Sequence, residues 1–452
     1  MAKRRIGILT SGGDCPGLNA TIRGAAKACY TMFGEDNVEI VGISNGFHGL
    51  IHNNCRIMKP EDFSGILTQG GTILGTKRTP YKMMQVIEAD NIDKVAEMKA
   101  TYKQQKLDCI LTLGGNGTHK TANLLSEEGL NIIGLPKTID NDIWGTDVTF
   151  GFHTAVDIAT EVVDRIHTTA TSHRRIMVIE IMGNKAGWLT LYSGIAGGAD
   201  IILIPEIPYD IDKVIDACEK RAQSGKTFSI IAVAEGAMDI SEAAMKKKER
   251  AKKRAEAGEV TVTNRIAKQI EAATGFESRT VVPGHILRGG SPSAYDRVLA
   301  TKFGARAAML IKQEKYGYTV AKIGSKISEN KLSDVTMKTK FVPENDELVI
   351  TGKSIGVSFG KKKHLLYVIP PIYGVSYQQD CDTAKSSDNI VLYNRLTDLI
   401  ILQKCPQHKA WGHLVYNFHS VINSLAAPPN ISRESSALIS GLSAFILSQR
   451  SI

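Results

Sequence analysis

Two segments that lie close together in the chain carry residue types used in phosphate chemistry. Residues 114–118 (Gly-Gly-Asn-Gly-Thr) are rich in glycine, whose lack of a side chain lets the backbone come close to an anion. Residues 136–142 (Pro-Lys-Thr-Ile-Asp-Asn-Asp) place two carboxylates two positions apart, beside a lysine. One segment suits a phosphoryl donor and the other suits activation of an acceptor, so the pair is typical of a small-molecule phosphotransferase.

The carboxylates of the second segment have two interpretations. Side chains alternate along an extended backbone, so Asp140 and Asp142 can project to the same side, together with Thr138. Clustered acids of this kind suit general-base and metal-binding work. An Asx-turn cluster that caps the next helix would use the same residues and is an equally good reading of this segment alone.

Two further segments have the same character. Residues 11–20 begin Ser-Gly-Gly after an apolar run and lead into a helical pattern, where helix N–H groups favour an anion. A tight strand-to-helix connection needs no more than this, but two such turns in one sheet favour a shared polyphosphate. Neither turn is a Walker A loop or a G-x-G-x-x-G fingerprint. In residues 283–292, His285 and Arg288 flank a glycine turn and can hold a phosphate, although His285 could equally be structural.

The elements that must position these residues alternate along the chain. Near-continuous apolar runs, which are typical of strands buried on both faces of a parallel sheet, occur at 5–10, 38–43, 109–113, 132–135, 176–181, 201–204 and 229–234. Helical patterns occur between them at 19–32, 118–127, 154–167 and 211–222. This alternation predicts an α/β fold of two doubly wound, Rossmann-like three-layer blocks with mostly parallel sheets. Ligands of such sheets bind beyond the carboxyl ends of the strands, where the four segments lie.

The division into domains is less sharply marked. We expect a first block at residues 1–170, completed by roughly 290–360, with the helix 293–313 packed back on it. A second block is expected at 171–289. Residues 371–452 carry no recognisable motif and stay unassigned: an extra subdomain, an oligomer contact and a poorly ordered tail are all compatible with them.

Composition excludes several classes of protein. The 452 residues contain no apolar run near the ~20 residues that span a bilayer, so no membrane partner is expected. The net charge is +9, and residues 246–254 hold seven basic residues in nine, but no aromatic residue interleaves them. A solvated surface helix or hairpin therefore explains this run better than a nucleic-acid site. The seven cysteines are scattered without a C-x-x-C pair, which suggests a reducing cytoplasm.

Taken in order, the motifs resemble the phosphofructokinase family. The ordered matches run from Arg5 to about Arg297, about two-thirds of the chain, and comprise 11–20, 70–75 with Arg78, 114–118, 138–142, Met182-Gly183, Glu235-Gly236 and 284–297. The resemblance implies transfer of a phosphoryl group to the 1-hydroxyl of fructose 6-phosphate, with Mg²⁺, in glycolysis. It also implies a homotetramer whose active sites use residues of neighbouring subunits.

The resemblance also implies a role for individual residues. Asp140 matches the family's general base, with Thr138 and Asp142 beside the reacting hydroxyl and Lys137 beside the transferred group. Positions that hold the phosphoryl donor are Gly13, Arg78, Gly115, Asn116, Gly117 and Thr118. Positions that hold fructose 6-phosphate within one subunit are Met182, Gly183, Asn184, Glu235, His285 and Arg288. Arg175 and Arg279 match the pair that reaches the 6-phosphate from a neighbour.

The chain departs from the family pattern at two places. Asn116 replaces the magnesium-holding aspartate, and losing a carboxylate near a cation costs on the order of 4 kcal/mol before compensation. We therefore expect weak metal binding through its amide oxygen or a bridging water. Asn184 stands where the family has arginine, and Lys185 replaces that charge in part.

The choice of donor depends on two positions. Gly117 leaves room for ATP where pyrophosphate-dependent members have a second aspartate, whereas Lys137 resembles the pyrophosphate users. Steric exclusion is the stronger discriminator, so we predict ATP. The alternatives are a pyrophosphate-dependent enzyme and a catalytically silent regulatory subunit that binds a sugar phosphate.

The family's bacterial effector site is only partly present. Arg23 and Arg56 keep arginines of that site, while Lys27 and His167 occupy positions where arginine is usual. We therefore expect a weak or absent response to ADP or phosphoenolpyruvate.

Overall fold

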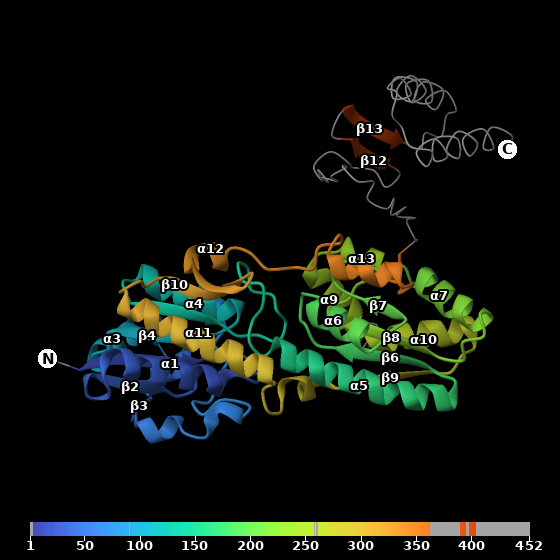
Figure 1. Cartoon of the computed structure of the whole chain (residues 1–452). Helices are drawn as coiled ribbons and strands as arrows, with labels where there is room; N and C mark the ends of the chain where they lie inside the picture. The colour runs from blue at the N-terminus through green and yellow to red at the C-terminus, as the bar shows by residue number, and fades with distance from the viewer. Residues whose placement is uncertain are drawn as a thin grey trace, which may run out of the picture. The chain divides into compact units, whose positions relative to one another are not determined.

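The computed structural model describes residues 3–89, 91–256, 258, 261–361, 389–394 and 397–403. The chain divides into two units, Met1–Lys363 and His364–Ile452. All segments with predicted chemistry belong to the first unit, which holds two sheets flanked by helices (Figure 1). In the second unit only a hairpin is described, β12 (Asn389–Asn394) with β13 (Thr397–Gln403). The prediction made for 371–452 otherwise lies outside the described residues.

The larger lobe is built on a seven-stranded sheet whose five central strands run parallel. In spatial order the strands are β11 (Lys326–Lys331), β10 (Tyr318–Ile323), β5 (Ile132–Pro136), β4 (Cys109–Gly114), β1 (Arg4–Thr10), β2 (Val38–Ile43) and β3 (Cys55–Met58). The edge strands β3 and β11 are antiparallel. All six residues of β4 are buried, which accounts for its near-continuous apolar sequence. The strand order reverses beside β1, a position where ligands bind in such sheets.

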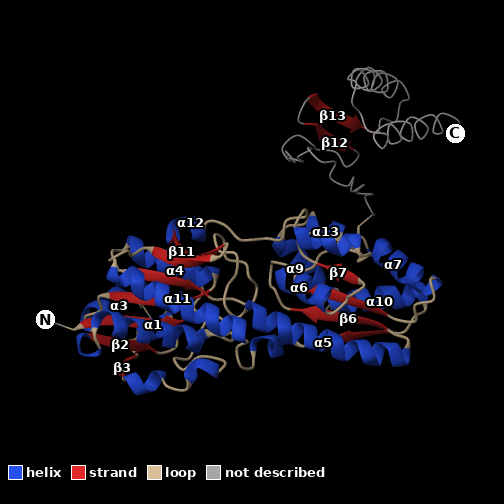
Figure 2. Ribbon diagram, viewed as in Figure 1, coloured by secondary structure: helices blue, strands red, loops and turns tan. Residues whose placement is uncertain are grey.

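The smaller lobe is built on a four-stranded, fully parallel sheet. Its strands in spatial order are β7 (Ile201–Leu203), β8 (Ser229–Ala234), β6 (Ile176–Ile181) and β9 (Ser278–Val281). Helices flank both sheets (Figure 2). The α/β fold with mostly parallel sheets is therefore confirmed.

The helices divide between the two lobes. Those of the larger lobe are α1 (Leu18–Phe33), α2 (Phe47–Ile51), α3 (Lys94–Gln104), α4 (Asn116–Glu127), α11 (Ala294–Lys312) and α12 (Leu332–Thr336). Those of the smaller lobe are α5 (Phe152–His173), α6 (Trp188–Ala196), α7 (Ile211–Gln223), α8 (Ile240–Ala243), α9 (Lys247–Glu256), α10 (Val262–Thr274) and α13 (Glu347–Ser354). Among the described residues, no helix is long and apolar enough to cross a membrane.

Helix α11 returns to the first part of the chain and packs on α1, as predicted for residues 293–313. The two helices cross closely, because a Cβ atom at Gly304 would lie only 2.5 Å from the carbonyl oxygen of Thr21. A larger residue at Gly304 would force the helices apart. Helix α5, about 33 Å long at 1.5 Å per residue, begins beside the larger sheet and continues into the smaller lobe (Figure 1). One continuous apolar core contains residues of both sheets.

Several elements differ from the sequence prediction. The strands predicted at 38–43, 176–181 and 229–234 coincide with β2, β6 and β8. Strands β3, β9, β10 and β11 were not predicted, since they are short or half-exposed and lack a continuous apolar run. The basic run forms α9, which has no buried residue, so the prediction of a surface helix is confirmed.

Candidate active site

A cavity of about 260 Å³ lies at the carboxyl ends of β1, β4 and β5. Its walls come from the turns that follow these strands, from residues 78–81 and from two residues of the smaller lobe. The lining residues are Ser11, Gly12, Gly13, Phe47, Arg78, Thr79, Pro80, Tyr81, Gly115, Asn116, Gly117, Thr118, Lys137, Thr138, Asp140, Asp142, Asn184 and Arg288. The cavity thus contains every residue predicted to be catalytic or to hold the donor.

The glycine turn at the cavity forms the start of α4. Gly115 precedes the helix, and Asn116, Gly117 and Thr118 form its first turn, so their N–H groups and the helix dipole favour an anion. No heavy atom lies within 4 Å of the position that a Cβ atom would take at Gly117. The cavity is therefore open at the position where a side chain would restrict the donor.

His119 links this turn to the neighbouring strand β10 by hydrogen bonds. Its Nδ1 lies 3.0 Å from the carbonyl oxygen of Gly115, and its Nε2 lies 2.8 Å from Thr319 Oγ1 on β10. The carbonyl can only accept, so Nδ1 carries the proton and Thr319 donates to Nε2. Burial lowers the pKa of His119 to about 4, which keeps the ring neutral. The turn is thereby fixed to the sheet without an added charge.

Asp140 is the carboxylate with the most unusual surroundings. Its Oδ1 is buried and accepts no hydrogen bond from the described residues. Its backbone N–H donates to Thr138 Oγ1 at 3.0 Å, which orients the turn. Burial, and next the neighbouring Asp142 carboxylate, raise the pKa of Asp140 from 3.8 to about 7, against the opposing charges of Arg288 and Lys137. A carboxylate with a free lone pair and a pKa near neutrality can accept a proton from a bound hydroxyl.

Asn116 and Asp142 form a pair across the cavity wall. The Asn116 side-chain Nδ2 donates to Asp142 Oδ2 at 2.8 Å and lies 3.3 Å from the Asp142 carbonyl oxygen. Burial raises the pKa of Asp142, while the bond from Asn116 opposes this rise. An aspartate at position 116 would repel Asp142, so the asparagine stabilises the ionised Asp142 carboxylate.

Two cations lie close to these carboxylates. Lys137 is 3% exposed and donates from Nζ to the carbonyl oxygen of Gly13. Burial lowers the pKa of Lys137. The Arg288 guanidinium lies against Gly13, where an added Cβ would come within 2.4 Å of Nη1, and donates to the carbonyl oxygen of Asp14 at 3.2 Å. Both cations can therefore neutralise a phosphoryl group in the cavity.

The residues predicted to hold the sugar phosphate are divided by the structure. Met182, Gly183 and Asn184 follow the carboxyl end of β6, and Asn184 lines the cavity. Glu235 follows the carboxyl end of β8, and its Oε1 accepts from the Asn184 backbone N–H at 2.6 Å. His285 is exposed in the short turn Gly284–Arg288 that follows β9. Apart from Arg288, only Asn184 of these residues lines the cavity, and Glu235 is linked to the cavity through its bond with Asn184.

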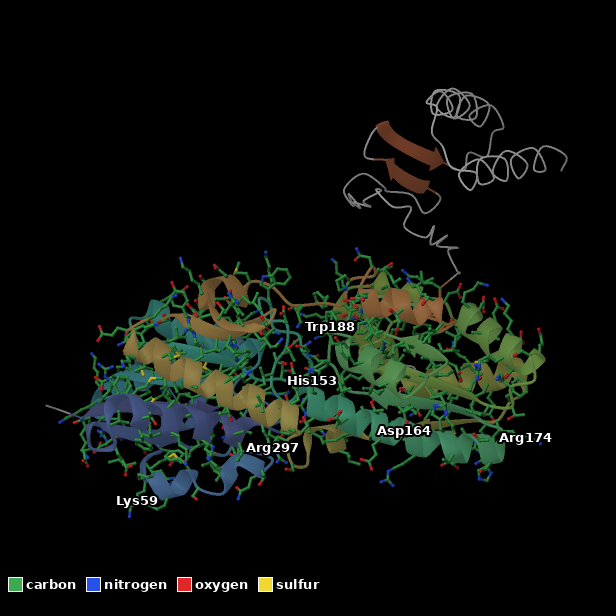
Figure 3. The ribbon with its side chains drawn as sticks, in the orientation of Figure 1. Lys59, His153, Asp164, Arg174, Trp188 and Arg297 are labelled. Atoms are coloured by element: carbon green, nitrogen blue, oxygen red, sulfur yellow. The ribbon has the colours of Figure 1, made fainter. Side chains whose placement is uncertain are left out.

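Arg175 and Arg279 lie elsewhere. They stand at the amino ends of β6 and β9, where Arg279 pairs in register with Met177. At about 3.3 Å per residue, Arg175 is about 23 Å from Met182 along the strand. Figure 3 shows the preceding residue, Arg174, at the outer end of α5, far from Trp188 and His153 near the junction of the lobes. Glu277 bonds both arginines and keeps them together. They cannot reach the cavity of their own chain.

Four cavity residues were missed by sequence reasoning: Phe47, Thr79, Pro80 and Tyr81. The last three follow Arg78 directly, and this adjacency was the only available signal. Phe47 begins α2 and is fully buried, so nothing in the sequence distinguishes it from a core residue. It enters the cavity because the helix folds over the carboxyl end of the sheet.

The oxygen-bearing residues of the cavity suit a hard divalent cation. No group of three or more His, Cys, Asp or Glu side chains placed to hold a metal is found in the part of the chain that the structure describes. Mg²⁺ usually keeps waters and is bound through one or two carboxylates together with substrate phosphates. Asp142 and the Asn116 amide oxygen fit a cation that arrives with the donor, which leaves the unpartnered Asp140 oxygen for the acceptor hydroxyl.

Two of the predicted effector-site residues are engaged within the chain. Arg56 donates to Asp62 Oδ2 at 3.1 Å, and His167 Nε2 lies 2.7 Å from the carbonyl oxygen of Gly197. Each side chain thus has a partner within the chain, although the other guanidinium N–H groups of the exposed Arg56 stay available.

Comparisons with known proteins agree with this geometry. A family model described as Phosphofructokinase matches residues 5–311. The ATP-dependent 6-phosphofructokinase of Spirochaeta thermophila is 54% identical over 79% of this chain and 98% of its own length. The ATP-dependent 6-phosphofructokinase 3 of Bacteroides thetaiotaomicron is 47% identical over 79% of this chain and 100% of its own length. The pyrophosphate–fructose 6-phosphate 1-phosphotransferase of Amycolatopsis mediterranei is 44% identical over 75% and 96%.

A solved structure with lower sequence identity is also a phosphofructokinase. Phosphofructokinase from Saccharomyces cerevisiae is 29% identical with a TM-score of 0.64, over 74% of this chain and 45% of the yeast chain. This chain therefore spans less than half of the yeast subunit. The range of the family model contains every residue that lines the cavity.

Proposed function

This chain belongs to the phosphofructokinase family, and we propose that it is an enzyme that transfers the γ-phosphoryl group of ATP to the 1-hydroxyl of fructose 6-phosphate. The product is fructose 1,6-bisphosphate, and the reaction is a step of glycolysis. The observation that carries the proposal is the unpartnered Asp140 oxygen opposite the glycine turn at the start of α4. A base for the acceptor and an anion site for the donor then face the same cavity.

Different residues of the chain have different roles in the proposed reaction. Asp140 accepts the proton of the 1-hydroxyl as the hydroxyl oxygen bonds the γ-phosphorus of ATP, while the bond from that phosphorus to the β,γ-bridging oxygen breaks and ADP leaves. A pKa near 7 suits this proton transfer at neutral pH. Lys137, Arg288 and the N-terminus of α4 stabilise the charge on the transferred group. Asn116 and Thr138 orient the turn that carries the two carboxylates.

Magnesium is part of this proposal. Asp142 and the Asn116 amide oxygen would hold it together with the nucleotide phosphates, whose charge it would neutralise. Because the amide nitrogen of Asn116 already bonds Asp142, we expect the protein to contribute little to the metal's affinity.

ATP is the proposed donor because the cavity is open at Gly117. A larger side chain there would exclude the nucleotide's α-phosphate. Lys137, the residue shared with pyrophosphate users, bonds the Gly13 carbonyl oxygen, which gives it a role that does not depend on the donor. A pyrophosphate-dependent enzyme and a silent regulatory subunit remain less supported, since the two most identical relatives described above are named as ATP-dependent enzymes.

We also propose that copies of the chain assemble, as a tetramer, so that Arg175 and Arg279 of one copy complete the sugar-phosphate site of another. Their place at the amino edge of the smaller sheet supports this arrangement. The donor is assigned to the block of residues 1–170, completed by roughly 290–360, and the sugar phosphate to the block 171–289; within the first block, α5 and α13 pack on elements of the smaller lobe. The five described cysteines are free thiols, which supports a cytoplasmic location.

The proposal is tested by steady-state turnover of fructose 6-phosphate with ATP and, separately, with pyrophosphate, over a titration of Mg²⁺. Phosphorus NMR of the product should show a new phosphate on C1. We expect turnover with ATP and little with pyrophosphate. Turnover with pyrophosphate alone would contradict the choice of donor, and no turnover with either would favour the regulatory subunit. A weak or absent response to ADP is also expected, since Lys27 and His167 occupy positions where the family usually has arginine.

A further inference from the structure

Lys340 lies where the chain crosses from one lobe to the other. The crossover segment, residues 337–343, leads from α12 of the larger lobe towards α13 of the smaller lobe (Figures 1 and 2). It follows the end of the matched family range at residue 311. None of the phosphate motifs includes it. Its position behind the catalytic turn nevertheless brings Lys340 into contact with both sides of the active site.

The first set of contacts fixes the turn that carries the carboxylates. The Lys340 backbone N–H donates to the carbonyl oxygen of Asp142 at 2.9 Å. The adjacent Thr339 pairs with Ile143 in an antiparallel bridge. The ammonium group of Lys340 donates to the carbonyl oxygens of Thr146 and Asp147 at 3.0 and 2.8 Å. Lys340 and Thr339 together contact residues between 142 and 147, the first part of the segment that leads from the cavity into α5.

The second set of contacts connects Lys340 to Trp188, which follows the turn predicted to bind the sugar phosphate. The carbonyl oxygen of Lys340 accepts from Trp188 Nε1 at 3.0 Å, and its ammonium lies 5.4 Å from the centre of the Trp188 ring system. Trp188 is the first residue of α6 and follows the turn of Met182, Gly183 and Asn184 by a few residues. Figure 3 shows it near the junction of the lobes.

A neighbouring contact strengthens this link. Two residues further along the crossover segment, the Val342 backbone N–H donates to Glu206 Oε1 at 2.9 Å. The same oxygen accepts from the Gly187 backbone N–H at 2.9 Å. The crossover segment is thus linked to the end of the acceptor turn, residues 182–187, through Glu206 and Gly187, and to the first residue of α6 through Trp188.

We propose that Lys340 is a positioning residue that aligns the turn of Asp140 and Asp142 with the acceptor turn at 182–187. The inference rests on the proposed phosphoryl transfer, because alignment matters where an acceptor hydroxyl must meet both a base and a donor phosphorus. Small displacements of reacting groups cost large factors in rate, whereas each substrate alone can still bind. Lys340 therefore acts on turnover more than on affinity.

The test compares Lys340→Met with Lys338→Met in the full chain. Methionine keeps an unbranched side chain and removes the ammonium, whereas Lys338 is exposed and contacts only the Trp144 ring among the described side chains. For Lys340→Met we expect kcat to fall about tenfold or more, with KM for each substrate within about twofold of wild type. Lys338→Met should match wild type, and Lys340→Arg, which keeps a cationic donor, should recover most of the loss.

A second variant covers the case in which Lys340→Met does not fold. Trp188→Phe removes the indole donor to the Lys340 carbonyl oxygen and should also lower kcat with little change in KM. Melting temperatures of all variants separate lost alignment from lost folding.

Three results would overturn the inference while leaving the proposed function in place. They are equal kcat values for the two methionine variants, a loss that Lys340→Arg does not reduce, and an unchanged kcat in Trp188→Phe. A wild type that turns over with neither donor would overturn the proposed function itself and this inference with it.

Discussion

In the larger lobe, the turns after β1, β4 and β5 bring the predicted donor residues and the catalytic acids to one cavity. In the smaller lobe, the predicted sugar-phosphate residues are split between opposite edges of the sheet: Glu235 at the carboxyl end of β8, and Arg175 and Arg279 at the amino ends of β6 and β9. On the proposed assignment, one copy of the chain holds all the groups for phosphoryl transfer but only some of those that bind the acceptor's phosphate. We therefore expect the residues for phosphoryl transfer to come from one copy of the chain and the residues that bind the acceptor to come from two copies.

The largest loss of turnover that would test this difference between the lobes is expected for Asp140→Asn. The amide cannot take the proton of the 1-hydroxyl, so we expect turnover to fall by ~10²–10⁴. Binding of fructose 6-phosphate, measured by calorimetry, should stay within a few-fold of wild type. Asp164→Asn, at an exposed position of α5 (Figure 3), is the matched control and should be unchanged. Substantial turnover in Asp140→Asn would contradict the assignment of the base.

The smaller lobe is tested by Arg175→Ala together with Arg279→Ala. Loss of two charge-assisted contacts to the 6-phosphate should lower kcat/KM for fructose 6-phosphate by ~10²–10³. The affinity for ATP should be unchanged, because the donor residues lie in the other lobe. Arg165→Ala removes a surface arginine that pairs with Glu161 and serves as the control. An unchanged kcat/KM would show that the pair has no part in binding the acceptor.

The donor side of the cavity is tested by Gly117→Asp. The new carboxylate would enter open space at the start of α4 and would oppose the nucleotide phosphates by size and charge. We expect kcat/KM for ATP to fall by about 10- to 100-fold. Gly117→Ala adds only a Cβ atom with no neighbour within 4 Å and should keep most of the activity. Equal activity of Gly117→Asp with ATP would show that this position does not select the donor.

The raised pKa of Asp140 has consequences for both rate and stability. The base must be ionised in the free enzyme, so kcat/KM should fall on the acid side with a midpoint near pH 7. The native carboxyl holds its proton up to about pH 7 and the unfolded one only to about 3.8, so this group lowers stability as pH rises between these values.

Asp140→Asn removes the stability penalty. At pH 8 it should be more stable than wild type by on the order of 2–4 kcal/mol, and below about pH 4 the difference should vanish. Urea unfolding at several pH values measures this. An equal free energy of unfolding at pH 8 would contradict the burial of an ionised Asp140.

The smallest effect concerns Asn116→Asp. The new carboxylate would face Asp142 at the distance of the present hydrogen bond and repel it in the absence of metal. We expect a lower melting temperature without Mg²⁺, recovery when Mg²⁺ is added, and a few-fold lower Mg²⁺ concentration for half-maximal rate. Asn116→Ala loses the bond without adding charge and should show no gain in metal affinity. A melting temperature independent of Mg²⁺ in Asn116→Asp would contradict this account.

The sequence predicted those parts of the fold whose burial is uniform. Strand β8 is buried along its whole length, so its apolar run Ser-Ile-Ile-Ala-Val-Ala is visible in the sequence. Strand β11, with the sequence Lys-Ile-Ser-Glu-Asn-Lys, is a half-exposed edge strand and resembles a loop. Its existence depends on pairing with β10, which is a tertiary contact that no local pattern reveals.

Prediction of the candidate site was limited in the same way, because local sequence patterns do not reveal tertiary contacts. Gly117, Asp140 and Asp142 could be predicted because each belongs to a short turn directly after a buried strand. Phe47 and Lys340 could not, since their place depends on a helix and a crossover segment that fold over the sheet from distant parts of the chain. The position of Arg175 and Arg279 at the amino end of the smaller sheet, away from the cavity, could be recognised only from the register of its strands.

Complementation between two inactive proteins tests the central claim most directly. Asp140→Asn keeps both arginines, and the double variant Arg175→Ala, Arg279→Ala keeps the base, so a mixed assembly contains one site with every group intact. The account predicts that the two proteins, dissociated and reassembled together, regain turnover of fructose 6-phosphate well above the sum of their separate activities. No gain, although both variants fold and reassemble, would contradict the claim that the base and the phosphate-binding arginines come from different copies.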